Sequence, residues 1–138
     1  MAARHGKVGI LTFSEHRQTA EQPSVAIERL LQQRLAHRLE AEGYEVVAGE
    51  EVVSTKEIAV REARRLAAEG CDITVFNFVS WGGPHLTAIA AQFAPRPLLL
   101  FCNLDAQHRG LAAMLSCAGA LNQLGAKYFR AWGDIEDT

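Results

Sequence analysis

The chain has 138 residues, a formal net charge of −2 and a composition that is 49% hydrophobic and 22% charged, which fits one globular domain. This charge balance excludes the basic excess that a nucleic-acid-binding face needs. The longest strongly apolar run, around Pro97–Cys102, is too short to span a bilayer, so no membrane partner is expected.

Strand and helix patterns alternate along the whole chain. Short runs rich in Val, Ile and Phe predict buried strands, and apolar residues at helical spacing predict the helices between them. In chain order the expected elements are strand Lys7–Phe13, helix Ser24–Glu42, strand Tyr44–Ala48, a helix from Ser54 to about Glu69, strand Asp72–Phe78, a helix from Pro84 to near Phe93, strand Pro97–Asn103, helix Gly110–Leu124 and strand Lys127–Trp132.

Turn and cap residues mark the ends of these helices. The run Ser54–Glu57 fits a capping box, in which the Ser hydroxyl and the Glu carboxylate each satisfy an orphan amide. Pro84 suits a first helical turn, where its missing amide costs nothing. Three helices are followed by a glycine, which tolerates the left-handed backbone of a helix end: Gly43, Gly70 and Gly125.

Five strands with short helical connections predict a parallel sheet with helices on both faces, which is a three-layer α/β sandwich. Right-handed crossovers leave few possible strand orders. We expect the flavodoxin-like order 2-1-3-4-5, with the Rossmann-type order 3-2-1-4-5 as the alternative. The sequence shows no internal repeat or linker, and residues 1–138 are interpreted as a single domain whose acidic tail, Asp134–Asp137, is typical of a domain edge.

The three cysteines, Cys71, Cys102 and Cys117, lack the paired spacing of a zinc site. The polar segment Met1–Lys7 leads straight into a strand and does not have the pattern of a signal peptide. We therefore interpret the cysteines as buried, reduced thiols of a cytoplasmic protein.

Polar residues concentrate in the loops that follow the strands. In open parallel sheets ligands bind beyond the carboxyl ends of the strands, where the strand order reverses. In the expected order this place lies between the first and third strands. The loops bring both tryptophans and three of the five histidines to one rim. The candidate ligand-binding residues on this rim are Arg17, Asn77, Trp81, His85 and Asn103.

Several of these residues also have a structural interpretation. Arg17 could be a solvated surface charge, and Trp81 could cap the core instead of offering a flat apolar wall to a sugar ring. His85, in the first turn of a helix, is more often structural than catalytic. Both interpretations of these residues stay open on the sequence alone.

The same rim offers two further groupings of polar residues. His16, His85 and His108 could together hold a metal, since imidazole is a common ligand. Glu15 and Asp105 could form an acid/base pair. The spacing of neither group is diagnostic.

Familiar functions of flavodoxin-like folds are excluded by the same loops. The loop after the first strand has no glycine, so it fits neither a flavin-phosphate loop nor a dinucleotide fingerprint. A phosphate-accepting receiver needs acidic residues at the strand ends, where this chain has Phe13-Ser14 and Asn77-Phe78.

The run Asn77–Thr87, with the letters NFVSWGGPHLT, resembles the N-terminal domain of the L-fucose isomerase family, whose architecture arabinose isomerase shares. Leu100–Asn103, Gly110–Leu111 and Ala118–Leu121 extend the resemblance, which covers Val8–Ile135. The stretch from the third to the fifth strand carries its most specific part.

The resemblance implies an aldose–ketose isomerase that uses a divalent metal, usually Mn²⁺. In the family two acidic residues and a histidine of a later domain hold this metal, and the N-terminal domain reaches into the active site of a neighbouring subunit. In the family, an Arg after the first strand and a Trp after the third enter the active site of the neighbouring subunit. The matching positions in this sequence are Arg17 and Trp81. The resemblance assigns no defined role to Asn77, His85 or Asn103, which are expected to support the rim.

Family members are several times longer, and their metal-binding domain has no counterpart in this chain. We therefore expect no catalytic residue and no metal ligand here, and an inactive isolated chain. Its expected partners are a monosaccharide substrate, a metal-binding isomerase domain or subunit, and further copies of itself in a homo-oligomer. The alternative is a stand-alone, non-catalytic module that binds a sugar or serves assembly.

Overall fold

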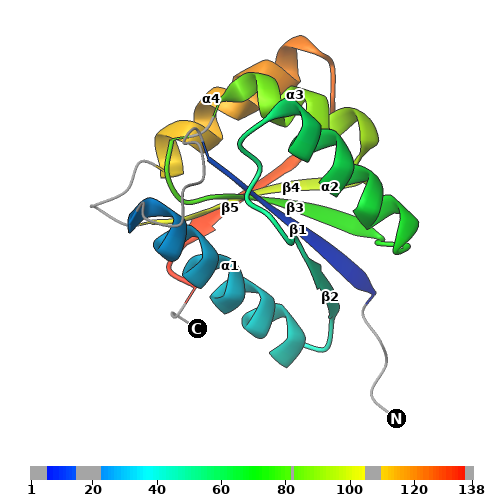
Figure 1. Ribbon diagram of the computed structural model, residues 1–138, viewed down its shortest axis with the longest axis vertical. Helices are drawn as coiled ribbons and strands as arrows, with labels where there is room; N and C mark the ends of the chain where they lie inside the picture. The colour runs from blue at the N-terminus through cyan, green and yellow to red at the C-terminus, as the bar shows by residue number, and fades with distance from the viewer. Residues whose placement is uncertain (1–5, 15–22, 82, 105–109, 136–138) are drawn as a thin grey trace.

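The computed structural model describes residues 6–14, 23–81, 83–104 and 110–135 (Figure 1). Strands and helices alternate along these residues, as the sequence predicts. In chain order they are β1 (Lys7–Phe13), α1 (Pro23–Ala41), β2 (Glu45–Ala48), α2 (Lys56–Ala68), β3 (Ile73–Phe78), α3 (Pro84–Phe93), β4 (Leu98–Asn103), α4 (Gly110–Gln123) and β5 (Phe129–Gly133).

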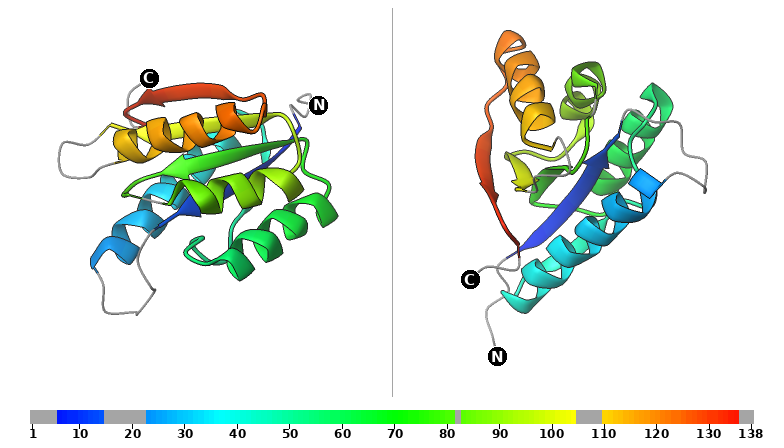
Figure 2. Two further views of the ribbon diagram at one scale, coloured as in Figure 1. Left: turned by 90° about the horizontal axis from the view of Figure 1, so that it is seen from above. Right: turned by 90° about the vertical axis from the view of Figure 1, so that its left-hand side faces the viewer.

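The five strands form one parallel sheet in the order β2-β1-β3-β4-β5. This confirms the flavodoxin-like order, and the Rossmann-type alternative was wrong. α1 covers one face of the sheet, and α2, α3 and α4 cover the other, so the expected three layers are present (Figure 2). The order reverses between β1 and β3, whose ends are level because Thr12 pairs with Asn77 and Phe13 with Phe78.

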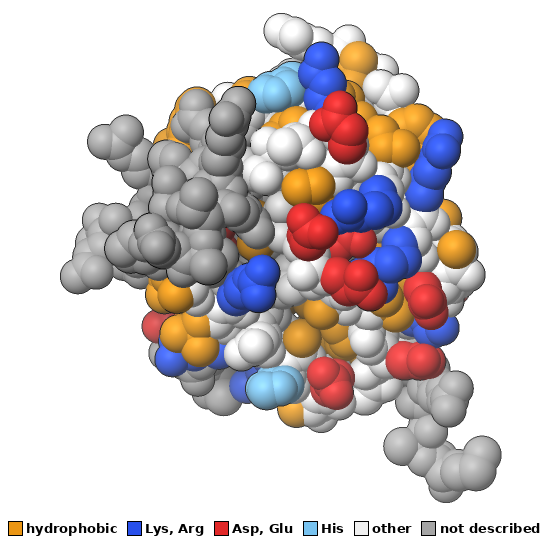
Figure 3. Space-filling model, in the orientation of Figure 1, with side chains coloured by type: hydrophobic (Ala, Val, Ile, Leu, Met, Phe, Trp, Pro, Cys, Tyr) orange, Lys and Arg blue, Asp and Glu red, His pale blue; other side chains and the backbone are white. Residues whose placement is uncertain are grey.

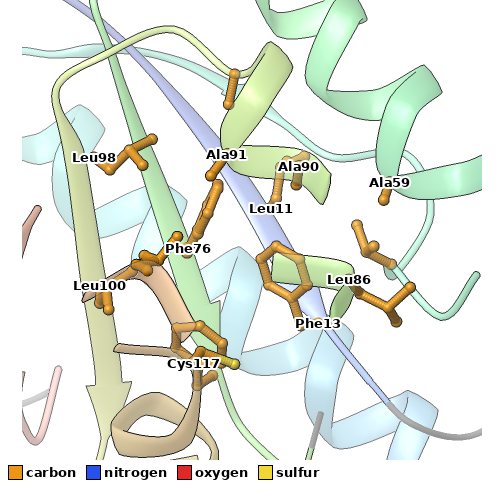
Figure 4. Packing of buried hydrophobic residues seen from close by; sticks show 14 of the residues in the cluster. Leu11, Phe13, Ala59, Phe76, Leu86, Ala90, Ala91, Leu98, Leu100 and Cys117 are labelled. Carbon is orange, nitrogen blue, oxygen red and sulfur yellow. The ribbon is translucent and has the colours of Figure 1, made fainter. Parts of the chain in front are cut away.

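The larger core lies between the sheet and the three helices α2, α3 and α4 (Figure 4). Its centre is a group of fully buried rings: Phe13 lies 4.9 Å from Phe76 and 5.5 Å from Phe78 between ring centroids. Each such side chain contributes roughly 1.5–3 kcal/mol through burial. A smaller core, which includes Ile10 and Leu35, joins α1 to the opposite face.

The observed helix ends lie within one residue of the predicted ones except at the start of α2. Three glycines that follow helices have the positive φ that was expected: Gly43 (98°), Gly70 (76°) and Gly125 (71°). The capping box assigned to Ser54 was wrong by one residue. Thr55 is the extended residue that precedes the helix, and its hydroxyl accepts a hydrogen bond from the amide of Ile58 at 3.2 Å.

Charges on the surface are mixed. On the face seen in Figure 3, Lys and Arg side chains are interspersed with Asp and Glu. Arg61 and Glu51 form an exposed ion pair at 2.8 Å. Exposed pairs of this kind contribute little to stability. Among the helices that the structure describes, none combines the length and the apolar character needed to cross a bilayer.

Candidate functional site

Three polar side chains are buried where β1 and β3 end, at the point where the strand order reverses. Thr12 and Ser14 are fully buried and Asn77 is 1% exposed. Burying a polar group is unfavourable unless it is hydrogen-bonded. Polar residues in the most central strands are therefore held there by specific partners, and we call this group the β1–β3 crevice, a name for its place where the strand order reverses and not for a hollow in the surface.

A chain of hydrogen bonds ties the crevice to α1. Nδ2 of Asn77 donates to Oγ1 of Thr12 at 3.0 Å, and that hydroxyl donates to Oε1 of Gln32 at 2.6 Å. Nε2 of Gln32 then donates to the carbonyl of Gly49 at 3.0 Å. These hydrogen bonds link β3, β1, α1 and the loop after β2, and they fix the orientation of the Asn77 amide.

A buried carboxylate lies one turn before Gln32 on the same side of α1. Glu28 is fully buried, and Oγ of Ser80, just after β3, donates a hydrogen bond to its Oε1. Sequence analysis missed both residues. Glu28 lies on the same buried side of helix α1 as Leu31 and Leu35. An acidic residue within an apolar helical stripe is the sequence signal that could have revealed Glu28.

Trp81 follows Ser80 directly, beyond the end of β3. Its ring is half-buried and packs against the larger core. The side chain therefore has both a core contact and a surface that remains accessible. This placement agrees with the structural interpretation of Trp81 and leaves the ligand-binding interpretation open.

His85 is exposed in the first turn of α3. Its imidazole lies over Gly83, where a Cβ would come within 2.6 Å of the ring carbon Cε1. Gly83 thus leaves room for the ring, and no hydrogen bond to the β1–β3 crevice is recorded for His85 among the described residues.

Asn103 lies in a different place, at the end of β4. Its Oδ1 accepts a hydrogen bond from the amide of Ile135 at 2.8 Å, which fixes the chain after β5. Of the sequence candidates, the structure therefore places Asn77 in the β1–β3 crevice, Trp81 beyond the end of β3 against the larger core, and Asn103 beside β5. Arg17, Glu15, His16, Asp105 and His108 lie outside the described residues.

The described side chains do not form a metal centre. In residues 6–14, 23–81, 83–104 and 110–135, no three His, Cys, Asp or Glu residues are grouped closely enough to hold a metal ion. The Mn²⁺ that the resemblance implies therefore has no ligand set in this part of the chain. Surface hollows along α2 and beside residues 126–130 include no residue of the crevice.

The cysteines are not poised as nucleophiles. Burial raises the pKa of Cys102 to about 11. Burial also raises the pKa of Cys117 to about 11, although a hydrogen bond from Thr87 opposes the shift. A thiol is nucleophilic as its thiolate, so both groups are inert at neutral pH.

Comparison with known families identifies the family of this chain. The model described as L-fucose isomerase, first N-terminal domain, matches residues 5–138. This span includes every described strand and helix and all five sequence candidates. No curated protein matches the chain.

Proposed function

Because the chain belongs to the L-fucose isomerase first N-terminal domain family, we propose that it is the substrate-contacting and assembly domain of an aldose–ketose isomerase. In this proposal the catalytic metal is held by a different domain or subunit, and this chain contributes side chains to that site in trans. The observation that carries the proposal is the family match over residues 5–138, joined to the buried polar groups of the β1–β3 crevice.

The chemistry of the crevice suits a sugar. A monosaccharide presents hydroxyl groups and an apolar ring face, so its site combines polar groups with an aromatic wall. Ser80 and Trp81 are consecutive residues beyond the end of β3: Ser80 donates to Glu28 of α1, and half-buried Trp81 packs against the larger core. Asn77, within β3, is oriented by its hydrogen bond to Thr12. Arg17 belongs to the proposed site through the family motif.

The division of labour follows from what isomerisation requires. A bound metal polarises the carbonyl and neighbouring hydroxyl while an acid/base group moves the proton. Mn²⁺ supplies this polarisation when the other domain holds it. The residues of this chain orient the sugar and exclude water, and positioning of that kind is worth several kcal/mol to a reaction barrier.

Reconstitution tests the proposal. The chain is mixed with the metal-binding portion of a family enzyme, and conversion of aldose to ketose is followed with Mn²⁺ present. We expect turnover from the mixture and none from either part alone. Turnover by the isolated chain would contradict the proposal, as would a metal-binding portion that is fully active without it.

A calorimetric titration separates the alternative of a non-catalytic sugar module. The isolated chain is titrated without metal against fucose, arabinose and the corresponding ketoses. Binding tighter than about 1 mM would favour the module. We expect none at that level, because an in-trans site is incomplete without its partner.

A further inference from the structure

The surface around β5 is unusually apolar. Five of the seven large hydrophobic side chains that are exposed in the described residues lie beside it or on it: Leu104, Leu111, Leu115, Phe129 and Trp132. Phe129 is 66% exposed and Trp132 is 59% exposed. Exposed apolar side chains gathered at one edge of a sheet indicate an interaction site, because natural proteins normally protect exposed strand edges.

β5 exposes an aromatic ring on each face of the sheet. Phe129 pairs with Leu99 and so lies on the α1 face, whereas Trp132 pairs with Cys102 and lies on the α4 face. α1 packs against β1 and β2, which leaves the β5 side of its face uncovered. The exposure is therefore a property of the strand edge and not of one misplaced side chain.

The backbone of β5 can accept another strand. Gly133 directs its carbonyl towards β4, where it accepts a hydrogen bond from the amide of Leu104 at 2.9 Å. Backbone groups alternate in direction along a strand, so the amides and carbonyls of Arg130 and Trp132 point outwards. In the described part of the chain β5 is the last strand of the sheet, with no neighbour on that side (Figure 2).

We propose that β5 pairs antiparallel with β5 of a second copy of this chain, in a register centred on Trp132. In this register Trp132 lies opposite the partner's Trp132, and Arg130 lies opposite the partner's Asp134. Both pairs fall on the α4 face, and opposite charges or aromatic rings across two strands stabilise the pairing. The outward groups of Arg130 and Trp132 are the ones that an antiparallel ladder requires at these positions.

The same symmetry brings α4 of each copy to the same face of the extended sheet. Leu111 and Leu115 share a helical stripe with Asn122, whose Oδ1 accepts a hydrogen bond from the Tyr128 hydroxyl just before β5. The stripe therefore runs along the side of α4 that is next to β5. Pairing of the strands would bury these leucines between the two α4 helices, which adds apolar area to the backbone contacts.

This surface is independent of the proposed function. β4 and β3 separate β5 from β1, so a strand added at β5 does not reach the β1–β3 crevice. Failure of either proposal would leave the other intact.

Cysteine cross-linking tests the register. Antiparallel hydrogen-bonded pairs have Cα atoms about 5.5 Å apart, within the range that a disulfide spans. Trp132→Cys should therefore form a covalent dimer on mild oxidation. The matched control is Phe129→Cys, an exposed position of the same strand whose two copies would be about 20 Å apart. The natural cysteines are buried and give no background.

Charge reversal tests the opposed side chains. Arg130→Glu should raise the dimer dissociation constant at least about tenfold in sedimentation equilibrium, and the double variant Arg130→Glu/Asp134→Arg should restore it. A wild-type chain that stays monomeric up to about 1 mM would overturn the proposal. The proposal would also be overturned if Phe129→Cys cross-linked at the rate of Trp132→Cys, or if the double variant did not regain the wild-type dissociation constant. It would likewise be overturned if another isomerase domain covered the β5 edge and blocked the Trp132→Cys cross-link.

Discussion

The buried carboxylate of Glu62 accepts a hydrogen bond from Nε of Arg65, one turn further along α2, at 3.0 Å. The same carboxylate accepts hydrogen bonds from the amides of Glu50 and Glu51, at 2.6 Å and 2.9 Å, and Arg65 also donates to the carbonyl of Ala48. Glu62 thus fastens α2 to the loop after β2, and it is only 1% exposed.

Replacing Glu62 should destabilise the domain strongly. Glu62→Gln removes the charge that Arg65 and two backbone amides share, so we expect the free energy of unfolding to fall by roughly 2–3 kcal/mol. Urea denaturation measures this change. Glu57→Gln is the control, because Glu57 is an exposed carboxylate of the same helix and its loss should cost well under 1 kcal/mol. Equal losses of stability in the two variants would contradict the role of Glu62 in fastening α2 to the loop after β2.

The contribution of Glu62 should depend on pH with a defined sign. Burial alone would raise its pKa, but the hydrogen bonds from Glu51, Arg65 and Glu50 outweigh it, and the pKa lies below the ordinary value of 4.5. The unfolded state then binds a proton first as pH falls, so stability is present above 4.5 and is lost as pH drops through the native pKa. The difference in unfolding free energy between wild type and Glu62→Gln should therefore be constant at about pH 6–7. It should shrink as the pH falls below 4.5. A gap that widens under acid would show the opposite sign.

Gly110 should not tolerate a side chain. A Cβ there would lie 2.5 Å from the carbonyl oxygen of Phe78 and 3.0 Å from that of Val79, and backbone atoms of a central strand cannot yield cheaply. Gly110→Ala should destabilise by about 1–3 kcal/mol in thermal or urea unfolding. Gly119 lies on the same helix, and a Cβ added there would meet no other atom within 4 Å. Gly119→Ala should therefore stabilise the domain by up to about 1 kcal/mol.

The thiols should be silent in the folded protein. Cys102 and Cys117 have pKa values of about 11, and burial raises the pKa of Cys71 as well. A chromogenic disulfide reagent at pH 8 should therefore react with the native chain only as fast as it unfolds, and with three thiols in denaturant. A rapid stoichiometric reaction of one native thiol would mean that a cysteine is accessible as thiolate.

Trp81 should matter for turnover more than for folding. In the complete isomerase, Trp81→Ala should lower kcat/KM for the sugar at least about tenfold, which corresponds to about 1.4 kcal/mol, while the domain still unfolds cooperatively. Phe93→Ala is the matched control, since Phe93 is another half-buried aromatic that packs on the same core. It should lower stability and leave kcat/KM unchanged. Equal kinetic effects of both variants would assign Trp81 to the core alone.

Much of the fold was predictable because its signals are local. The apolar run Lys7–Phe13 matches β1 without error, and Gly43, Gly70 and Gly125 end helices because they alone adopt a positive φ cheaply there. The cap of α2 was misplaced because two neighbouring hydroxyl residues both fit the pattern, and only the backbone conformation distinguishes Thr55 from its neighbour.

Less of the candidate site was predictable. The interpretation placed polar loops beyond the carboxyl ends of the strands, but it missed the buried Glu28 and the partly buried Gln32, which lie within helix α1. Their partners, Ser80 and Thr12, are 52 and 20 residues away, so no local pattern connects them. Asn103 was grouped with the rim because loops after adjacent strands look alike, whereas its partner Ile135 is set by the sheet order.

The hydrogen bonds from Asn77 to Gly49 also determine where α1 can rest on the sheet. Leucine side chains alone would permit a helix to slide by one turn, because one aliphatic contact replaces another at little cost. Sliding α1 by four residues would place Ala36 or Glu28 opposite Thr12. Alanine offers no acceptor to that hydroxyl, and a carboxylate has no proton for the Gly49 carbonyl. Polar matching thus selects a single longitudinal position for α1, and in that position Glu28 meets Ser80.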